Sequence, residues 1–248
     1  TPIVNVVGEH ATYHRKYDAP LTSDVAGFAA PVSGWVKVSE SANTVATDGA
    51  EAVQASMAPP GQVATLILPA DTAWNRTTAA PKPLPRIEPK AYSVDNVNDV
   101  ARALKTDEPS VILMNGELTA ARSAMADQIS QATGSRILMD TFVPRVHRGA
   151  GRAEVARLPY FGEMAAEVLE GTKHLILLSS QPPVTFFAYP DKPNYLTPEG
   201  CELHTLVERD EDIDGALEAL LDAVGGGDTS PRLVHLEIPD LPSGELNQ

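Results

Sequence analysis

Short apolar runs and amphipathic stretches alternate along the first third of this chain. The β-branched runs at 3–7, 35–39 and 64–68 predict strands, and the run at 3–7 has the composition of a buried strand. Helices are predicted over 22–30 and over 45–57, the second an Ala-rich amphipathic stretch. Strands that alternate with helices at this spacing indicate a parallel sheet with crossover helices.

The first predicted domain, residues 1–75, is short of strands for such a sheet. It supplies about three of them, and a buried parallel strand needs neighbours on both sides and cover on both faces. We therefore expect residues upstream of Thr1 to complete this sheet in the native protein.

The segment 76–92 differs in composition from the regions on either side. Pro81, Pro83, Pro85 and Pro89 disfavour a helix and favour an extended, semi-rigid connection. We predict that this segment is a linker between two domains.

Beyond the linker the alternation resumes, which predicts a doubly wound α/β domain over 93–225 and an exit linker over 226–248. The segment 233–238 in that linker is either a short strand or an extended piece of chain. Ser93, Gly134 and Gly225 suit helix ends. The predicted helices cover 94–105, 118–133, 160–170 and 213–224, and the predicted strands cover 111–114, 137–139, 174–178 and 202–207.

Composition excludes several classes of partner. The net charge of −14 makes binding to nucleic acid or to an anionic membrane unfavourable, because both need clustered Lys and Arg. No apolar run reaches the roughly 18 residues needed to span a bilayer. The single cysteine excludes an internal disulfide and suits a reducing cytoplasm, where we expect the protein to work.

The densest polar stretch, residues 8–24, follows the carboxyl end of the first predicted strand. Ligands of open α/β sheets bind at that edge, so the stretch is either a ligand-binding segment or a solvated connection. His10 and His14 lie four residues apart, a spacing that binds metal on a helix, but the segment is rich in turns and we predict no metal site. His174 and His204 fall in apolar strands, where we expect hydrogen-bonded buried imidazoles and not ligands.

A second polar segment combines glycine and arginine. Arg148-Gly149-Ala150-Gly151-Arg152, with Arg145 nearby, could hold an anion or nucleotide through backbone amides and guanidinium groups. The glycine spacing is not that of a dinucleotide-binding loop, so a structural or partner-facing loop remains the other interpretation.

A set of short motifs runs through both predicted domains: Gly8, Tyr17-Asp18-Ala19-Pro20-Leu21, Asp24, Gly61-x-Val63 through Pro69-x-Asp71, Leu158-Pro159-Tyr160-Phe161-Gly162-Glu163-Met164 and Val184-Thr185-Phe186-Phe187-Ala188-Tyr189-Pro190. These motifs resemble those of thiamine-diphosphate-dependent enzymes in the acetolactate synthase and benzoylformate decarboxylase group. Residues 1 to about 75 are similar to the C-terminal half of the pyrimidine-binding domain, and 93–225 to the central domain of that family, a Rossmann-like fold.

The resemblance implies a lyase or transferase that acts on 2-keto acids with thiamine diphosphate and Mg²⁺, as a homo-oligomer. The cofactor would serve as an electron sink during decarboxylation and carboligation. His10 and His14 would then be acid–base groups of the pocket, supported by Tyr17, Asp18 and Asp24.

Departures from the family pattern limit what this chain can do by itself. The family's Glu that polarises the aminopyrimidine lies upstream of the matched region, and the Gly-Asp-Gly…Asn signature that holds Mg²⁺ and diphosphate is missing. We therefore expect no cofactor anchoring and no activity from this chain alone, as a fragment of the enzyme. Flavin is not expected, because Gln181-Pro182-Pro183-Val184-Thr185-Phe186 replaces the Arg-Phe-Asp-Asp-Arg-like run of flavin-dependent synthases.

A second function class stays open at this point. The chain could be a non-catalytic α/β module that binds an adenine nucleotide or acyl-CoA through its central domain, with Arg145, Arg148 and Arg152 as the anion-binding groups.

Overall fold

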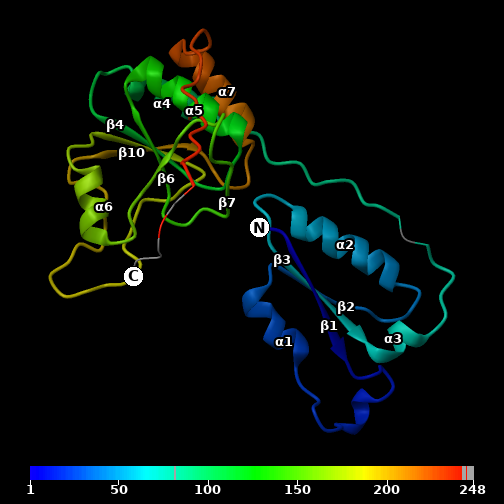
Figure 1. The fold of residues 1–248 in the computed structure, drawn as a ribbon. Helices are drawn as coiled ribbons and strands as arrows, with labels where there is room; N and C mark the ends of the chain where they lie inside the picture. The colour runs from blue at the N-terminus through cyan, green and yellow to red at the C-terminus, as the bar shows by residue number, and fades with distance from the viewer. Residues whose placement is uncertain (81, 242–243, 245–248) are drawn as a thin grey trace. The chain divides into compact units, whose positions relative to one another are not determined.

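The computed structural model describes residues 1–80, 82–241 and 244, and it divides into two compact units, Thr1–Lys90 and Ala91–Gln248 (Figure 1). The division falls within the Pro-rich segment 76–92, whose described residues form no helix; Pro81 lies outside the described residues. The side chain of Gln54 donates a hydrogen bond to the carbonyl oxygen of Pro85 at 2.8 Å, which attaches part of this segment to unit 1.

Unit 1 is a three-stranded parallel sheet in the order β1-β3-β2. Its small core consists of Ala52, Ala55, Ala64 and Leu66, where a helix packs on the central strand. The elements are β1 (Ile3–Glu9), α1 (Val25–Ala29), β2 (Trp35–Val38), α2 (Val45–Met57), β3 (Val63–Pro69) and α3 (Ala70–Trp74), with 3₁₀ turns at Arg15–Tyr17 and Ala30–Val32.

Two sequence predictions for unit 1 need correction. β1 is not buried: Val6 is 63% exposed and Ile3 45%, because β1 lies at the edge of the sheet and pairs only with β3. The helix predicted over 22–30 begins later, at Val25, because the Asp24 side chain accepts a hydrogen bond from the Gly27 amide at 2.8 Å and caps the helix there. The bounds of α2, in contrast, agree with the prediction.

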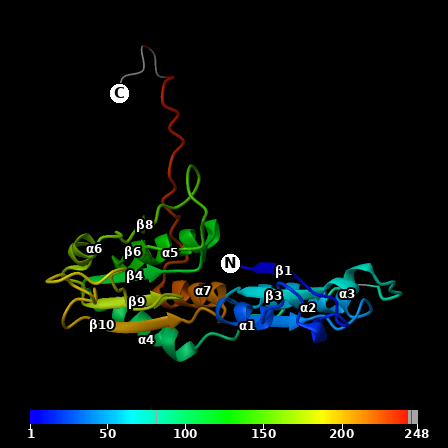
Figure 2. The same cartoon turned by 90° about the horizontal axis from the view of Figure 1, so that it is seen from below.

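Unit 2 contains a five-stranded parallel sheet in the order β10-β9-β4-β6-β8. Numbered along this unit, the strands follow the order 5-4-1-2-3, which is the doubly wound arrangement predicted. Figure 2 shows β6, β4, β9 and β10 side by side. The bounds are α4 (Val94–Leu104), β4 (Ser110–Met114), β5 (Glu117–Leu118), α5 (Ala120–Thr133), β6 (Arg136–Met139), β7 (Arg145–Val146), β8 (Ala156–Arg157), α6 (Gly162–Leu169), β9 (His174–Leu178), β10 (Glu202–Val207) and α7 (Ile213–Val224).

Helices cover both faces of this sheet. α4, α5 and α7 pack on one face through a cluster that includes Ile112, Ile176 and Leu206. α6 covers the other face, where Leu113 and Leu175 lie in the core (Figure 1). Side chains of β4 and β9 point alternately to the two faces of the sheet, and both faces are covered. All residues of these strands are therefore buried, which explains why the two strands are almost entirely apolar in sequence.

Three details of unit 2 differ from the prediction. Leu118 is not helical but lies in β5, which pairs with β7, because Thr119 caps α5 by accepting a hydrogen bond from the Arg122 amide at 3.2 Å. The helix predicted over 160–170 is limited to Gly162–Leu169. The short strands β7 and β8 were not predicted. The ends at Ser93, Gly134 and Gly225 are confirmed as helix caps.

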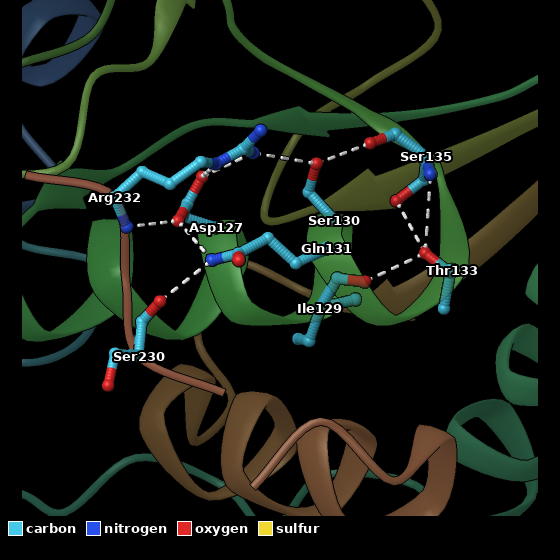
Figure 3. A network of polar contacts seen from close by, with 8 residues as sticks. All are labelled: Asp127, Ile129, Ser130, Gln131, Thr133, Ser135, Ser230 and Arg232. Atoms are coloured by element: carbon cyan, nitrogen blue, oxygen red, sulfur yellow. Dashed lines mark hydrogen bonds and ion pairs between the residues drawn. The ribbon is translucent and has the colours of Figure 1, made fainter. Parts of the chain in front are cut away.

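A polar network attaches the C-terminal segment to α5 (Figure 3). The buried Asp127 carboxylate accepts hydrogen bonds from the backbone amide of Arg232 at 2.7 Å and from its guanidinium at 2.6 and 2.9 Å. Gln131 donates to Asp127 and to the carbonyl oxygen of Ser230, both at 2.9 Å. Burial by itself would raise the pKa of Asp127, but the hydrogen bonds and charge of Arg232 outweigh it and hold that pKa below its ordinary value.

Further along the exit segment, Leu233 forms an isolated antiparallel bridge with Ala153, and 234–238 is extended without a strand. Within 1–80, 82–241 and 244, no helix has the length and apolar content needed to cross a bilayer.

Candidate functional site

A cavity of about 510 Å³ opens in unit 1 where β1 and β3 end at their carboxyl edges. Its wall includes Glu9 at the end of β1, His10, His14 and Arg15 from the segment after β1, and Trp74 from α3. The carboxyl edge of a parallel sheet is the usual place for a ligand, as predicted for this segment.

Asp71 holds the segment after β1 in place. Its carboxylate accepts hydrogen bonds from the Thr12 hydroxyl at 2.6 Å and from the Thr12 amide at 2.8 Å. These two bonds, the hydroxyl bond first, lower the pKa of Asp71 below its ordinary value. The Pro-x-Asp sequence at the end of β3 thus has a structural use that pattern reasoning alone did not assign: it fixes the loop that carries both histidines.

The structure brings His10 and His14 together. Their ring centroids lie 5.5 Å apart, and the His14 ring lies 5.8 Å from that of Tyr17. His10 Nε2 is 3.1 Å from the carbonyl oxygen of Pro20, which can only accept a hydrogen bond. A neutral His10 that donates from Nε2 keeps its Nδ1 lone pair free to accept a proton.

The three supporting residues that the resemblance implies are placed differently from the histidines. Asp24 caps α1, and Asp18 ends the 3₁₀ turn with a left-handed backbone at φ 48°. Tyr17 is 65% exposed and carries the Lys16 ammonium 5.0 Å above its ring. None of the three is among the described residues that line the cavity.

Arg15 is a wall residue that sequence reasoning missed. One of its terminal nitrogens pairs with the Glu9 carboxylate at 2.7 Å. Its Nε is buried and has no hydrogen-bond partner among the residues the structure describes.

The comparison with known proteins uses almost the whole chain. No family model matches it. Over 246 residues the chain is 46% identical to a protein of Mycobacterium tuberculosis that is provisionally named acetolactate synthase large subunit IlvX. The chain is thus similar in sequence to a protein named as an acetolactate synthase subunit. That similarity covers 99% of this chain and 47% of the relative, so the chain spans about half the length of the curated relative it matches.

Solved structures agree with the predicted fold of this family. A thiamin diphosphate-dependent enzyme from Mycobacterium smegmatis, provisionally assigned as such, superposes with a TM-score of 0.69 at 17% identity, over 94% of this chain and 48% of its own. A thiamine diphosphate-dependent 4-hydroxybenzoylformate decarboxylase from Rhodococcus jostii gives 0.67 at 18% identity, over 99% and 49%. At these identities the likeness concerns the fold.

The cavity residues do not form the family's cofactor anchor. Mg²⁺ with a diphosphate needs free carboxylate and carbonyl oxygens. Among the described lining residues the carboxylate is that of Glu9, and Arg15 already pairs with it. The described lining residues therefore offer no unpaired carboxylate for a metal ion.

Arg145, Arg148 and Arg152 each make different contacts in the structure. Arg145 in β7 pairs with Glu117 at 3.1 Å, and an Arg152 terminal nitrogen donates to the carbonyl oxygen of Gly151. Arg148 lines a cavity of about 140 Å³ beside Met139 and Val234, and neither of the other two arginines is among its described lining residues. Small-molecule sites usually measure at least about 300 Å³, so this cavity does not favour a nucleotide.

Proposed function

We propose that this chain is part of a thiamine-diphosphate-dependent enzyme that decarboxylates or ligates 2-keto acids, similar to acetolactate synthase. The observation that carries the proposal is a cavity with two adjacent imidazoles at the carboxyl edge of a parallel sheet, in a chain 46% identical to a relative named for that activity. Thiamine diphosphate would supply the electron sink for the reaction.

In this proposal His10 and His14 move protons at the wall of the pocket. Both rings line the cavity, and the Pro20 carbonyl orients His10. An imidazole is suited to this task because it gives and takes a proton near neutral pH.

The partners in this proposal are the remaining domains of the same enzyme and a second, identical subunit. The exposed apolar residues on the edge strand β1 support this, because Val6 at 63% and Ile3 at 45% exposure are costly to leave in water. The curated relative is about twice as long as the chain, which leaves room for further domains in such an enzyme.

The test is turnover of the complete enzyme that contains this chain. We expect His10→Gln or His14→Gln to lower turnover of a 2-keto acid at least about tenfold, equivalent to roughly 1.4 kcal/mol of barrier. The matched control is His235→Gln, an exposed histidine in the exit segment of unit 2, which should keep wild-type turnover.

The melting temperature separates chemistry from folding in this test. If His10 and His14 only hydrogen-bond the turn, replacing them would lower the melting temperature and leave turnover nearly unchanged. If both His10→Gln and His14→Gln keep wild-type turnover on a confirmed substrate, the proposed proton transfer is wrong.

A further inference from the structure

Three side chains of types that can bind metal meet at the amino-terminal edge of the unit 2 sheet, opposite the edge where open α/β sheets usually bind ligands. His174 is the first residue of β9, Glu202 is the first of β10, and His204 follows two residues later. His174 pairs with Glu202 in the parallel register, so all three side chains point to one face of the sheet. Ile176 and Leu206 continue that face, which α4 covers.

The distances suit a single metal ion. His174 Nδ1 and His204 Nε2 are 3.0 Å apart, and the Glu202 carboxylate lies 3.8 Å from each of these two nitrogens. Two imidazole nitrogens bound to one zinc ion at about 2.0–2.1 Å are separated by roughly 3.0–3.4 Å. The two rings thus need to separate by only a few tenths of an ångström, and the largely exposed Glu202 side chain is free to move toward them.

A fourth residue prepares His174 for this role. Its Nε2 lies 3.0 Å from the Glu108 carboxylate, which can only accept a hydrogen bond from Nε2–H; in that tautomer Nδ1 has a free lone pair. A carboxylate behind a metal-binding imidazole is the common arrangement in metal sites, where it fixes the ring and makes it a better ligand.

We propose that His174, His204 and Glu202 form a site for a transition-metal ion of the Zn²⁺, Co²⁺ or Ni²⁺ class, with Glu108 as the group that orients His174. Two imidazoles select these ions over Mg²⁺ or Ca²⁺, which prefer oxygen ligands. A water molecule can complete the coordination on the exposed side, next to Glu202. The bound ion would fasten the edge strand β10 to β9, and this role is independent of the proposed catalysis in unit 1.

The simpler use of these residues is a hydrogen-bonded histidine pair with no metal. In that arrangement the His204 Nε2–H donates to His174 Nδ1, and both rings are satisfied without an ion. Metal binding would replace that proton, so affinity should fall at acid pH, where imidazoles are protonated.

The experiment titrates the chelator-treated 248-residue chain with Zn²⁺ by calorimetry and with Co²⁺ by absorption spectroscopy. We expect one ion per chain with a Kd of about 10 µM or tighter near pH 7.5. His204→Asn should weaken binding at least about a hundredfold and Glu202→Gln about tenfold, since each removes one ligand. Both side chains are more exposed than His174, so these variants should keep the fold, which circular dichroism checks.

Two control variants test whether binding is specific to this cluster. The double variant His10→Asn/His14→Asn removes the other adjacent histidine pair, and Cys201→Ser removes the thiol of the residue before Glu202. Both controls should bind one Zn²⁺ with wild-type affinity, and Mg²⁺ should not compete.

A second readout is thermal stability. Zn²⁺ at a hundredfold excess over Kd should raise the Tm of the wild-type chain by about 5 °C or more and leave that of His204→Asn unchanged. Absence of binding at about 100 µM Zn²⁺, or wild-type affinity in His204→Asn, would overturn the site and leave the hydrogen-bonded pair as its explanation.

Discussion

In unit 2 every residue of β4 and β9 is buried, whereas in unit 1 no residue of β1 is buried. All three strands are short, apolar and parallel to their neighbours, so their composition does not explain the difference. β9 has strand neighbours on both sides and helices on both faces, and β1 has one neighbour. Burial of a strand is therefore a property of what surrounds it, and unit 1 lacks part of that surrounding.

The cores differ in the same way. Unit 2 has two clusters of buried side chains, one on each face of its sheet, and the Asp127–Arg232 network that fastens its C-terminal segment. Unit 1 has one cluster of four buried residues, three of them alanines. Since apolar burial is the main favourable term in folding, we expect unit 2 to be stable by itself and unit 1 to depend on further contacts.

Limited proteolysis should show the largest effect of this difference. We expect the first cuts in 76–92, followed by loss of unit 1, because its β1 edge and small core open easily. A protected fragment that begins near Ala91 should remain and melt cooperatively. Cleavage inside 111–140 as early as in 76–92 would contradict the comparison.

Truncating one side chain to Ala in β9 and one in β1 tests the difference in burial between these two strands. Ile176→Ala in β9, where the side chain is fully buried, should lower the free energy of unfolding by about 2–5 kcal/mol. Val6→Ala in β1, where the side chain is 63% exposed, should change it by less than about 0.5 kcal/mol in the 248-residue chain. Chemical denaturation measures both.

The stability cost of Val6→Ala can also be compared between the 248-residue chain and the complete enzyme. If further strands cover β1 there, the substitution should cost clearly more in the complete enzyme than in the chain. An equal and negligible cost in both would show that β1 stays exposed.

A smaller effect is expected at the polar link of unit 2. Arg232→Ala leaves the buried Asp127 carboxylate without its charged partner and should destabilise unit 2 by about 1–3 kcal/mol near neutral pH. Arg232→Lys, which keeps the charge and loses the paired guanidinium contacts, serves as the milder control.

The pKa of Asp127 gives this link a pH dependence. Because the folded pKa lies below the unfolded value of 3.8, the unfolded chain binds more protons in acid. The stabilisation is present above that value and is lost as the pH falls through the folded pKa. Acid titration of stability should therefore be less steep in Asp127→Asn, and an unchanged profile would contradict the assigned shift.

How far the sequence predicts this structure depends on whether a feature is local. β9 and α7 have the predicted bounds, because apolar spacing and the Gly225 cap are encoded within each element. The strands β7 and β8 have two residues each and are too short to show a period. The exposure of β1 could not be predicted, because it depends on which strands lie beside it.

The site follows the same rule. His10 and His14 were found because they follow a strand at the ligand-binding edge. The Thr12–Asp71 contact joins residues 59 positions apart, and the His174–His204 contact joins residues 30 apart. Only the parallel register of neighbouring strands brings these pairs together, and neither spacing is visible as a motif.

The most direct test of the central claim, that these residues form one part of a thiamine-diphosphate enzyme, is calorimetric titration with thiamine diphosphate and Mg²⁺. The 248-residue chain should show no specific binding, because its cavity offers no free carboxylate for the metal. The complete enzyme that contains the chain should bind the cofactor, and His10→Gln should retain that binding while it loses turnover. Micromolar affinity in the 248-residue chain, or no binding by the complete enzyme, would contradict the account.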